Sequence, residues 1–155
     1  MVKLFGPLIA DKKASGDAKG EFDLRALRAH MMVLAGNYRE AMEECKKLQE
    51  MYPTQLSPFL TEARAMYLQA KETKDVQKHR EALDYFTRIL PRLTPGNDSY
   101  WESWLRIIQC IEFVKGPAAS EEIKQKLKDL QSSSSDLGGE MYKQEYNRLV
   151  LKYGA

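Results

Sequence analysis

Apolar residues recur at spacings of three and four along most of the chain, which is the pattern of amphipathic helices. The first stripe is formed by Leu24, Leu27, Met31 and Leu34. Gly36-Asn37 then interrupts the pattern, as these residue types do where helices end. A second helix is predicted from Tyr38 to Tyr52-Pro53.

The same cycle of two helices and a break then repeats. Ser57-Pro58 predicts the next start, because serine caps helices and proline is tolerated in their first turn. We expect a charged connection at residues 74–78, followed by a partner helix that the Thr-Pro-Gly-Asn sequence at 94–97 closes.

A third cycle is expected to open with Asp98 or Ser99 as the helix cap and to break at Gly116-Pro117. After its second helix we expect a serine loop at 132–135 and a last helix from about Glu140. No segment shows the alternation of a strand between hairpin turns, so we predict an all-α fold.

The first helices of the three cycles align in four columns of apolar residues. The columns are Leu24, Leu60 and Trp104; Leu27, Ala63 and Ile107; Met31, Tyr67 and Ile111; and Leu34, Ala70 and Val114. Helix pairs that repeat every 30 to 50 residues or so indicate a solenoid, because a single pair cannot bury its apolar face without neighbours.

The motifs within these helices resemble those of the tetratricopeptide repeat (TPR) family. The similar segments are Tyr38-x2-Ala41-x3-Cys45 with Pro53, Ala82-x3-Phe86 with Pro95, and Trp104-x2-Ile107-x3-Ile111. The resemblance covers about residues 22–130 and implies a right-handed solenoid of three helix pairs, with the C-terminal helix as a cap. A related α-solenoid or an irregular helical bundle is the alternative.

The repeat can be aligned with the family in two registers that differ by one residue. The family has a small residue on its first helix, and the aligned columns put Arg28, Arg64 and Ile108 at that position. A shift of one residue puts Ala29 and Ala65 there instead.

In TPR folds the first helices line a concave groove that binds an extended peptide or a partner helix. The resemblance therefore implies that residues beside the apolar stripe contact a partner. These residues are Arg25, Met32, Thr61, Leu68, Gln69, Leu105, Gln109, Glu112 and Phe113. Some family members bind a terminal carboxylate there, but Glu102 stands where a basic residue is needed, so we do not predict that specificity.

Residues 1–20 are expected to be separate from a helical repeat domain at 21–155. The segment starts with apolar residues that include Leu4 and Phe5, and residues 11–20 are rich in Lys, Ala, Ser, Gly and Asp. This composition predicts an apolar arm and a flexible linker. The arm either folds back on the domain or docks on a partner, so Leu4 and Phe5 are candidate binding residues.

The helix predicted from Asp98 has almost no polar face. Its apolar residues include Trp101, Trp104, Leu105, Ile107, Ile108, Cys110, Ile111, Phe113 and Val114. Either its neighbours and the last helix enclose it, or part of it is an interface. In the second case Trp101 is also a candidate partner-binding residue.

The net charge, the length of the apolar stretches and the cysteines limit the classes of function that the chain can have. The formal net charge is +2, so charge argues against nucleic acid or an anionic membrane as the partner. No stretch approaches the roughly 18 apolar residues of a membrane span. Cys45 and Cys110 lie within apolar helical patterns and are expected to be buried free thiols, which suits a cytoplasmic protein.

The chain shows no arrangement of residues typical of an active site. His30 and His79 are the only histidines, and neither has the further ligands of a metal site. Gly138-Gly139 lacks the strand and lysine of a phosphate-binding loop. We therefore predict a non-catalytic module without cofactor or metal that binds another protein or a peptide. The alternative is a structural subunit of a homo-oligomer or larger assembly.

Overall fold

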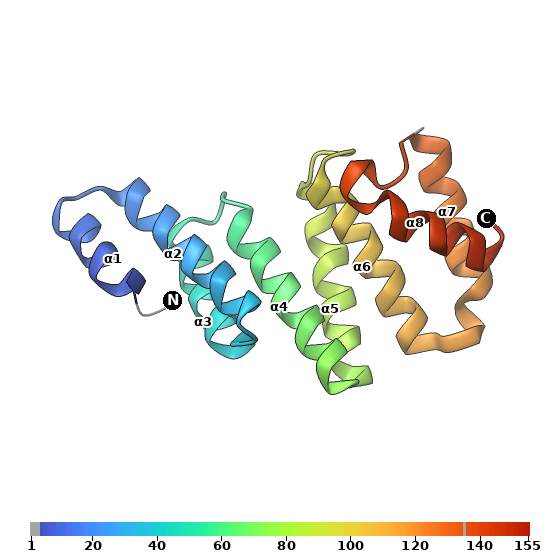
Figure 1. Cartoon of the computed structure of the whole chain (residues 1–155), viewed down its shortest axis with the longest axis horizontal. Coiled ribbons are helices and arrows are strands. Elements are labelled where there is room, and N and C mark those ends of the chain that lie inside the picture. The colour runs from blue at the N-terminus through green and yellow to red at the C-terminus, as the bar shows by residue number, and fades with distance from the viewer. Residues whose placement is uncertain (1–3, 135) are drawn as a thin grey trace. The chain divides into compact units, whose positions relative to one another are not determined.

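A computed structural model describes residues 4–134 and 136–155, and these residues form helices and no strand (Figure 1). The predicted all-α class is confirmed. Residues 1–3, which begin the expected arm, and Ser135 in the expected serine loop lie outside the described residues. None of the described helices is both long enough and apolar enough to cross a membrane. The chain divides into two compact units, Met1–Glu72 and Thr73–Ala155.

Unit 1 consists of four successive helices. They are α1 (Phe5–Ala14), α2 (Ala18–Leu34), α3 (Tyr38–Met51) and α4 (Ser57–Thr73). Helix α2 packs against both α1 and α3. A cluster of Val33, Ala41 and Ala65 joins α2, α3 and α4, and the small side chains of the two alanines allow the helices to approach closely.

The predicted flexible linker at residues 11–20 is wrong, because this segment is helical except for a short turn. Gly16 takes a φ of +73°, which ends α1, and Asp17 then caps α2 by accepting a hydrogen bond from the Gly20 amide at 2.8 Å. Lys12 pairs with the same aspartate at 2.9 Å. Small and polar residues here form helix ends and not an extended linker.

The predicted core stripe of α2 is also wrong, because the helix faces the other way. Ala29 and Val33 are buried, whereas Leu27 and Leu34 are exposed. Of the two registers considered above, the one with Ala29 and Ala65 at the small positions fits this burial. Close packing against α3 selects the face with small residues, although leucines predominate on the opposite face.

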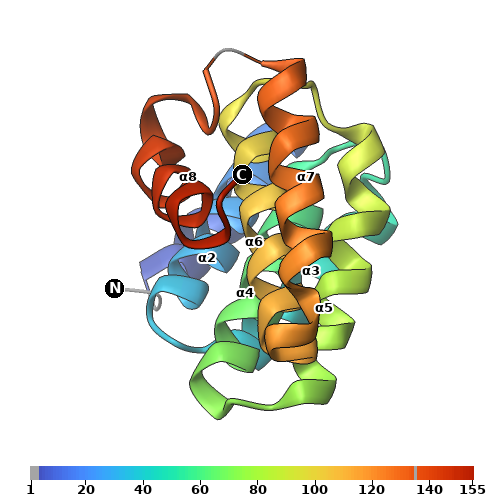
Figure 2. The same cartoon turned by 90° about the vertical axis from the view of Figure 1, so that its right-hand side faces the viewer.

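Unit 2 contains four longer helices and two short 3-10 segments. They are α5 (Val76–Ile89), η2 (Leu90–Arg92), α6 (Asp98–Lys115), η3 (Gly116–Ala119), α7 (Ser120–Ser133) and α8 (Gly139–Tyr153). Helix α6 packs against α5, α7 and α8 within this unit (Figure 2). These neighbours bury much of the apolar helix, although Trp104 and Val114 are half-buried and Phe113 is exposed.

Two predicted loops of unit 2 are shorter than expected. The connection expected at 74–78 ends at Asp75, whose carboxylate accepts hydrogen bonds from the Gln77 and Lys78 amides and so starts α5 at Val76. Ser132 and Ser133, expected in a loop, extend α7. Helix α6 does begin at Asp98, but its cap is Asn97, which accepts a hydrogen bond from the Tyr100 amide.

Candidate partner-binding surface

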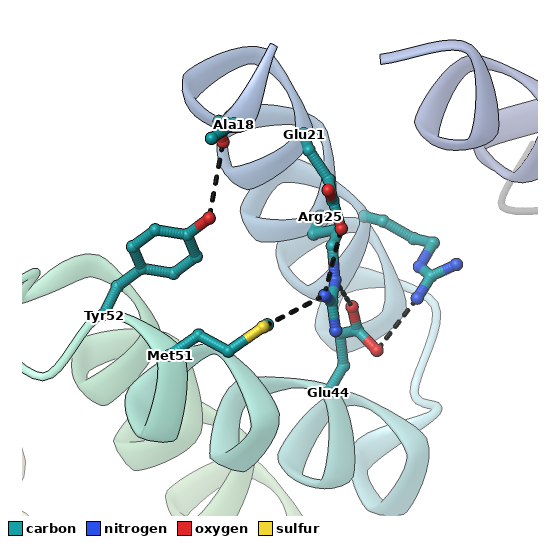
Figure 3. A network of polar contacts seen from close by, with 7 residues as sticks. Ala18, Glu21, Arg25, Glu44, Met51 and Tyr52 are labelled. Atoms are coloured by element: carbon teal, nitrogen blue, oxygen red, sulfur yellow. Dashed lines mark hydrogen bonds and ion pairs between the residues drawn. The ribbon is translucent and has the colours of Figure 1, made fainter. Parts of the chain in front are cut away.

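Arg25 is the first residue of the predicted groove, and it lies in a network that joins α2 to α3 (Figure 3). Its Nε donates to Glu44 Oε1 at 2.6 Å, and its Nη1 lies 3.3 Å from Glu21 Oε1. Arg28 reaches the other oxygen of Glu44 at 2.9 Å. The Arg25 side chain is only 14% exposed, so it has little surface to offer a partner.

Glu44 is the acceptor at the centre of this network. Burial alone would raise the pKa of its carboxyl group, but the hydrogen bonds and positive charges of Arg25 and Arg28 outweigh that effect and hold the pKa below its ordinary value. The group therefore stays ionised near neutral pH and fixes both arginines. Phe22 and Tyr52 pack edge to face beside them, with ring centroids 4.9 Å apart.

The other predicted groove residues of unit 1 are also not free at the surface. Met32 and Leu68 are half-buried and pack against the Val33–Ala41–Ala65 cluster. Thr61 is buried, and Gln69 is half-buried and already makes an interaction. The predicted face of α2 thus contributes to the core of unit 1.

The predicted residues of α6 fall into two groups. Trp101 and Leu105 are buried in the core of unit 2, so their prediction as surface residues is wrong. The reason is that α8 covers this side of α6, where the Tyr146 hydroxyl donates to the Trp101 carbonyl at 2.8 Å. Gln109 accepts a hydrogen bond from Arg106 at 2.9 Å.

Glu112 and Phe113 lie nearer the surface. Glu112 accepts hydrogen bonds from Lys152 and, at 2.6 Å, from the Tyr153 hydroxyl, at the edge of an open hollow of about 450 Å³. These polar groups satisfy one another. Phe113 is 41% exposed and stacks on His79 with ring centroids 3.8 Å apart.

Four leucines, one just before α1, one on α1 and two on α2, are the most exposed large apolar residues of unit 1. Leu4 is 71% exposed and Leu8 54%, while Leu27 is 49% and Leu34 66% exposed. Helix α1 has no buried residue, and Phe5 is half-buried. We call the four leucines, together with the half-buried Leu24 and Met31 of the same α2 stripe, the α1–α2 apolar surface.

This surface can bind only by burying aliphatic groups, since it contains no charged or nucleophilic side chain. Leu24, Leu27, Met31 and Leu34 follow spacings of three, four and three, which place them on one face of α2. The same alternation forms the seam between packed helices in coiled coils. Each leucine fully removed from water would contribute about 1.5–3 kcal/mol.

Sequence reasoning found this stripe but assigned it to the core. Of the two candidate binding residues of the arm, Leu4 is exposed and Phe5 is half-buried. The missed signal was Ala29, whose small side chain marks the packed side of α2. Comparison of the sequence with protein-family models, with curated proteins and with solved structures found no match.

Proposed function

We propose that this chain is a non-catalytic, TPR-like helical repeat protein that binds a partner protein through the α1–α2 apolar surface. The observation that carries the proposal is the exposure of four leucines on or next to two helices that pack together: Leu4 just before α1, Leu8 on α1, and Leu27 and Leu34 on α2. Large exposed apolar side chains that gather on one part of a protein mark interaction sites.

The TPR-like arrangement is supported by the small residues of the second helices. Ala41 and Ala82, which stand at the Ala-x3 positions, are both fully buried, as are Cys45 and Phe86 four residues later. Each unit therefore uses the same pattern of a small and a larger residue on one helix face.

The shape of the surface favours a helical partner over a small molecule. A seam of aliphatic residues along one helix face accepts the apolar stripe of another amphipathic helix. Small molecules, in contrast, bind mainly in concave pockets that enclose them.

The test is a double substitution, Leu27→Gln with Leu34→Gln, compared with Leu151→Gln. Leu151 lies on α8 and is 84% exposed, so its variant controls for the loss of an exposed leucine elsewhere. Tagged wild type and variants are used to purify partners from the native host, and the partners are quantified by mass spectrometry. We expect at least one partner to be lost from the double variant alone. Equal recovery in all three would contradict the proposal.

A homo-oligomer is the second candidate, because aliphatic groups pack equally well against a second copy of the same surface. The solution mass measured by light scattering distinguishes a foreign partner from a second copy of this chain. A wild-type monomer would support a foreign partner. A wild-type oligomer that becomes monomeric in the double variant, but not in Leu151→Gln, would show that the partner is a second copy.

A further inference from the structure

Met51 ends α3 beside the network of Arg25 and Glu44, and this residue is 47% exposed (Figure 3). Its sulfur accepts a hydrogen bond from Arg25 Nη1, with the two atoms 3.7 Å apart. Met141 on α8 is also exposed, at 62%, but its sulfur has no hydrogen-bond donor among the described residues. Met51 is therefore both open to reagents in solution and in contact with a charged donor.

The Arg25 guanidinium is held in place by other groups, whatever the sulfur accepts. Its Nε donates to Glu44 at 2.6 Å, while its Nη1 lies 3.3 Å from Glu21. The contact with Glu21 is longer than the roughly 2.7–2.9 Å of strong charge-assisted hydrogen bonds. Nη1 is thus a fixed and weakly bound donor that faces Met51.

Oxidation would give this donor a better acceptor. A thioether sulfur accepts hydrogen bonds weakly, whereas the oxygen of a methionine sulfoxide is strongly polar. In the reaction with hydrogen peroxide, a lone pair of the sulfur attacks one peroxide oxygen, so an S–O bond forms and the O–O bond breaks. The hydroxide that leaves takes the proton of the transferred oxygen and becomes water. The sulfur is oxidised by two electrons and the peroxide is reduced.

The distance between the sulfur and Nη1 suits the oxidised side chain. At 3.7 Å it exceeds the roughly 2.7–3.2 Å of an N–H···O bond, so an oxygen on the sulfur can approach the donor more closely than the sulfur does. The rotatable bonds of the methionine side chain allow that oxygen to turn toward Arg25. Because Arg25 belongs to α2 and Met51 to α3, the bond would join the two helices.

We propose that Met51 is a site of reversible oxidation by hydrogen peroxide, and that Arg25 binds the oxygen of the resulting sulfoxide. Oxidation at this position strengthens the link between α2 and α3, whereas a sulfoxide usually disrupts apolar packing. Methionine sulfoxide reductases reverse the reaction: two thiols are oxidised to a disulfide, and the oxygen leaves as water. The site uses none of the leucines of the α1–α2 apolar surface and does not depend on the proposed function.

The experiment compares two variants of the full chain, each of which keeps one exposed methionine. Met141→Leu keeps Met51, and Met51→Leu keeps Met141 as the matched control. Both variants are treated with hydrogen peroxide, and the oxidised positions are mapped by mass spectrometry. Because oxidation depends on access to the sulfur, the exposed methionine should react at least about fivefold faster than the half-buried methionines at 31, 32, 42 and 66.

Urea unfolding then measures the effect of each sulfoxide, after a peroxide treatment mild enough to spare the half-buried methionines. Oxidation of Met51 should lower the equilibrium constant of unfolding about fivefold, because a charged donor gains a stronger acceptor. Oxidation of Met141 should change that constant by less than about twofold, as most changes at isolated surface positions do. The two epimer-specific sulfoxide reductases together should restore both the mass and the unfolding constant of the folded chain.

Arg25→Leu in the Met141→Leu chain identifies the donor, since oxidation of Met51 should then no longer lower the unfolding constant. If this variant does not fold, the comparison of Met51 with Met141 decides alone. Three results would overturn the proposal: a higher unfolding constant after oxidation of Met51, equal effects at the two methionines, or a Met51 sulfoxide that the reductases do not remove. The double variant Leu27→Gln with Leu34→Gln should keep the oxidation effect, so failure of the proposed function leaves this site intact.

Discussion

Glu44 illustrates how a single carboxylate can link two helices. It lies between Arg25 and Arg28, and its pKa is held below the ordinary value of 4.5 because their attraction outweighs the effect of burial. A carboxyl group with a lowered pKa stabilises the fold above its unfolded pKa, and that contribution is lost as the pH falls through the folded pKa. The sequence showed Arg25 and Glu44 as surface-type residues, and only the packing of α2 on α3 brings them together.

We predict that Glu44→Gln lowers the free energy of unfolding by about 1–3 kcal/mol at pH 7, because both arginines lose their charged partner. Urea unfolding at pH 7 and at pH 3 measures the free energy of unfolding of both proteins. Wild type should lose more stability than the variant on acidification. The matched control is Glu43→Gln, since Glu43 is exposed and its ion pair with Arg39 is long, at 3.7 Å. This substitution should change the free energy of unfolding by less than about 0.5 kcal/mol.

The two cysteines should be unreactive in the folded protein. Burial raises the pKa of both thiols to about 12, with the nearby Glu62 and Glu44 adding to the effect at Cys45 and Arg106 opposing it at Cys110. Because only the thiolate reacts, a disulfide reagent at pH 8 should modify neither cysteine in the native state and both in denaturant. Rapid modification of the native protein would contradict the packing around them.

Helices were easier to predict than the faces they bury. Caps, prolines and glycines are local signals, and they placed α3, α4, α6 and α8 to within a residue or so. The face of α2 depends on which neighbour approaches it, and both of its sides carry apolar residues. Helix α1 was missed because its ten residues include a glycine and a proline, and because α1 has no buried residue of its own.

Asp17 caps α2 and pairs with Lys12 of α1, so both helix ends should depend on this residue. Asp17→Ala removes the acceptor for the Gly20 amide and the partner of Lys12, and should destabilise the start of α2 and the end of α1. Hydrogen exchange should show faster exchange at residues 5–20 and unchanged exchange in α3. Asp23→Ala, which removes only an exposed pair with Lys19, is the control. The same exchange profile in both variants would exclude the cap as the cause.

Among the hydrogen bonds that join α8 to α6, the one from Tyr146 is buried. Tyr146→Phe removes the hydroxyl that donates to the Trp101 carbonyl, and should lower the free energy of unfolding by about 1–2 kcal/mol. Tyr100→Phe, beside the same tryptophan, is the control because no hydrogen bond of its hydroxyl to a described residue is present. Equal stability of the two variants would show that the hydroxyl contributes little.

For the molecule as a whole, the sequence predicted the all-α class, but neither helix α1 nor the division at residue 72/73. The repeat columns run through both units, because each unit uses the same local pattern. Which leucines remain exposed depends on where a neighbouring helix ends, and α1 is shorter than α2. The exposed surface is therefore a property of the packed structure, which no single helix pattern contains.

Because each unit has its own core, an alanine substitution in one core should lower the stability of that unit more than that of the other. Leu48 in unit 1 and Phe86 in unit 2 are both fully buried, and replacement of either by alanine should cost about 2–5 kcal/mol. Both tryptophans are in unit 2, so their fluorescence reports that unit, while circular dichroism reports the helices of both. Leu48→Ala should move the dichroism transition to lower urea more than the fluorescence transition, and Phe86→Ala should move the fluorescence transition strongly. If both probes shifted together in both variants, the two units would unfold as one cooperative structure, as neighbouring repeats do when their coupling exceeds their individual stabilities.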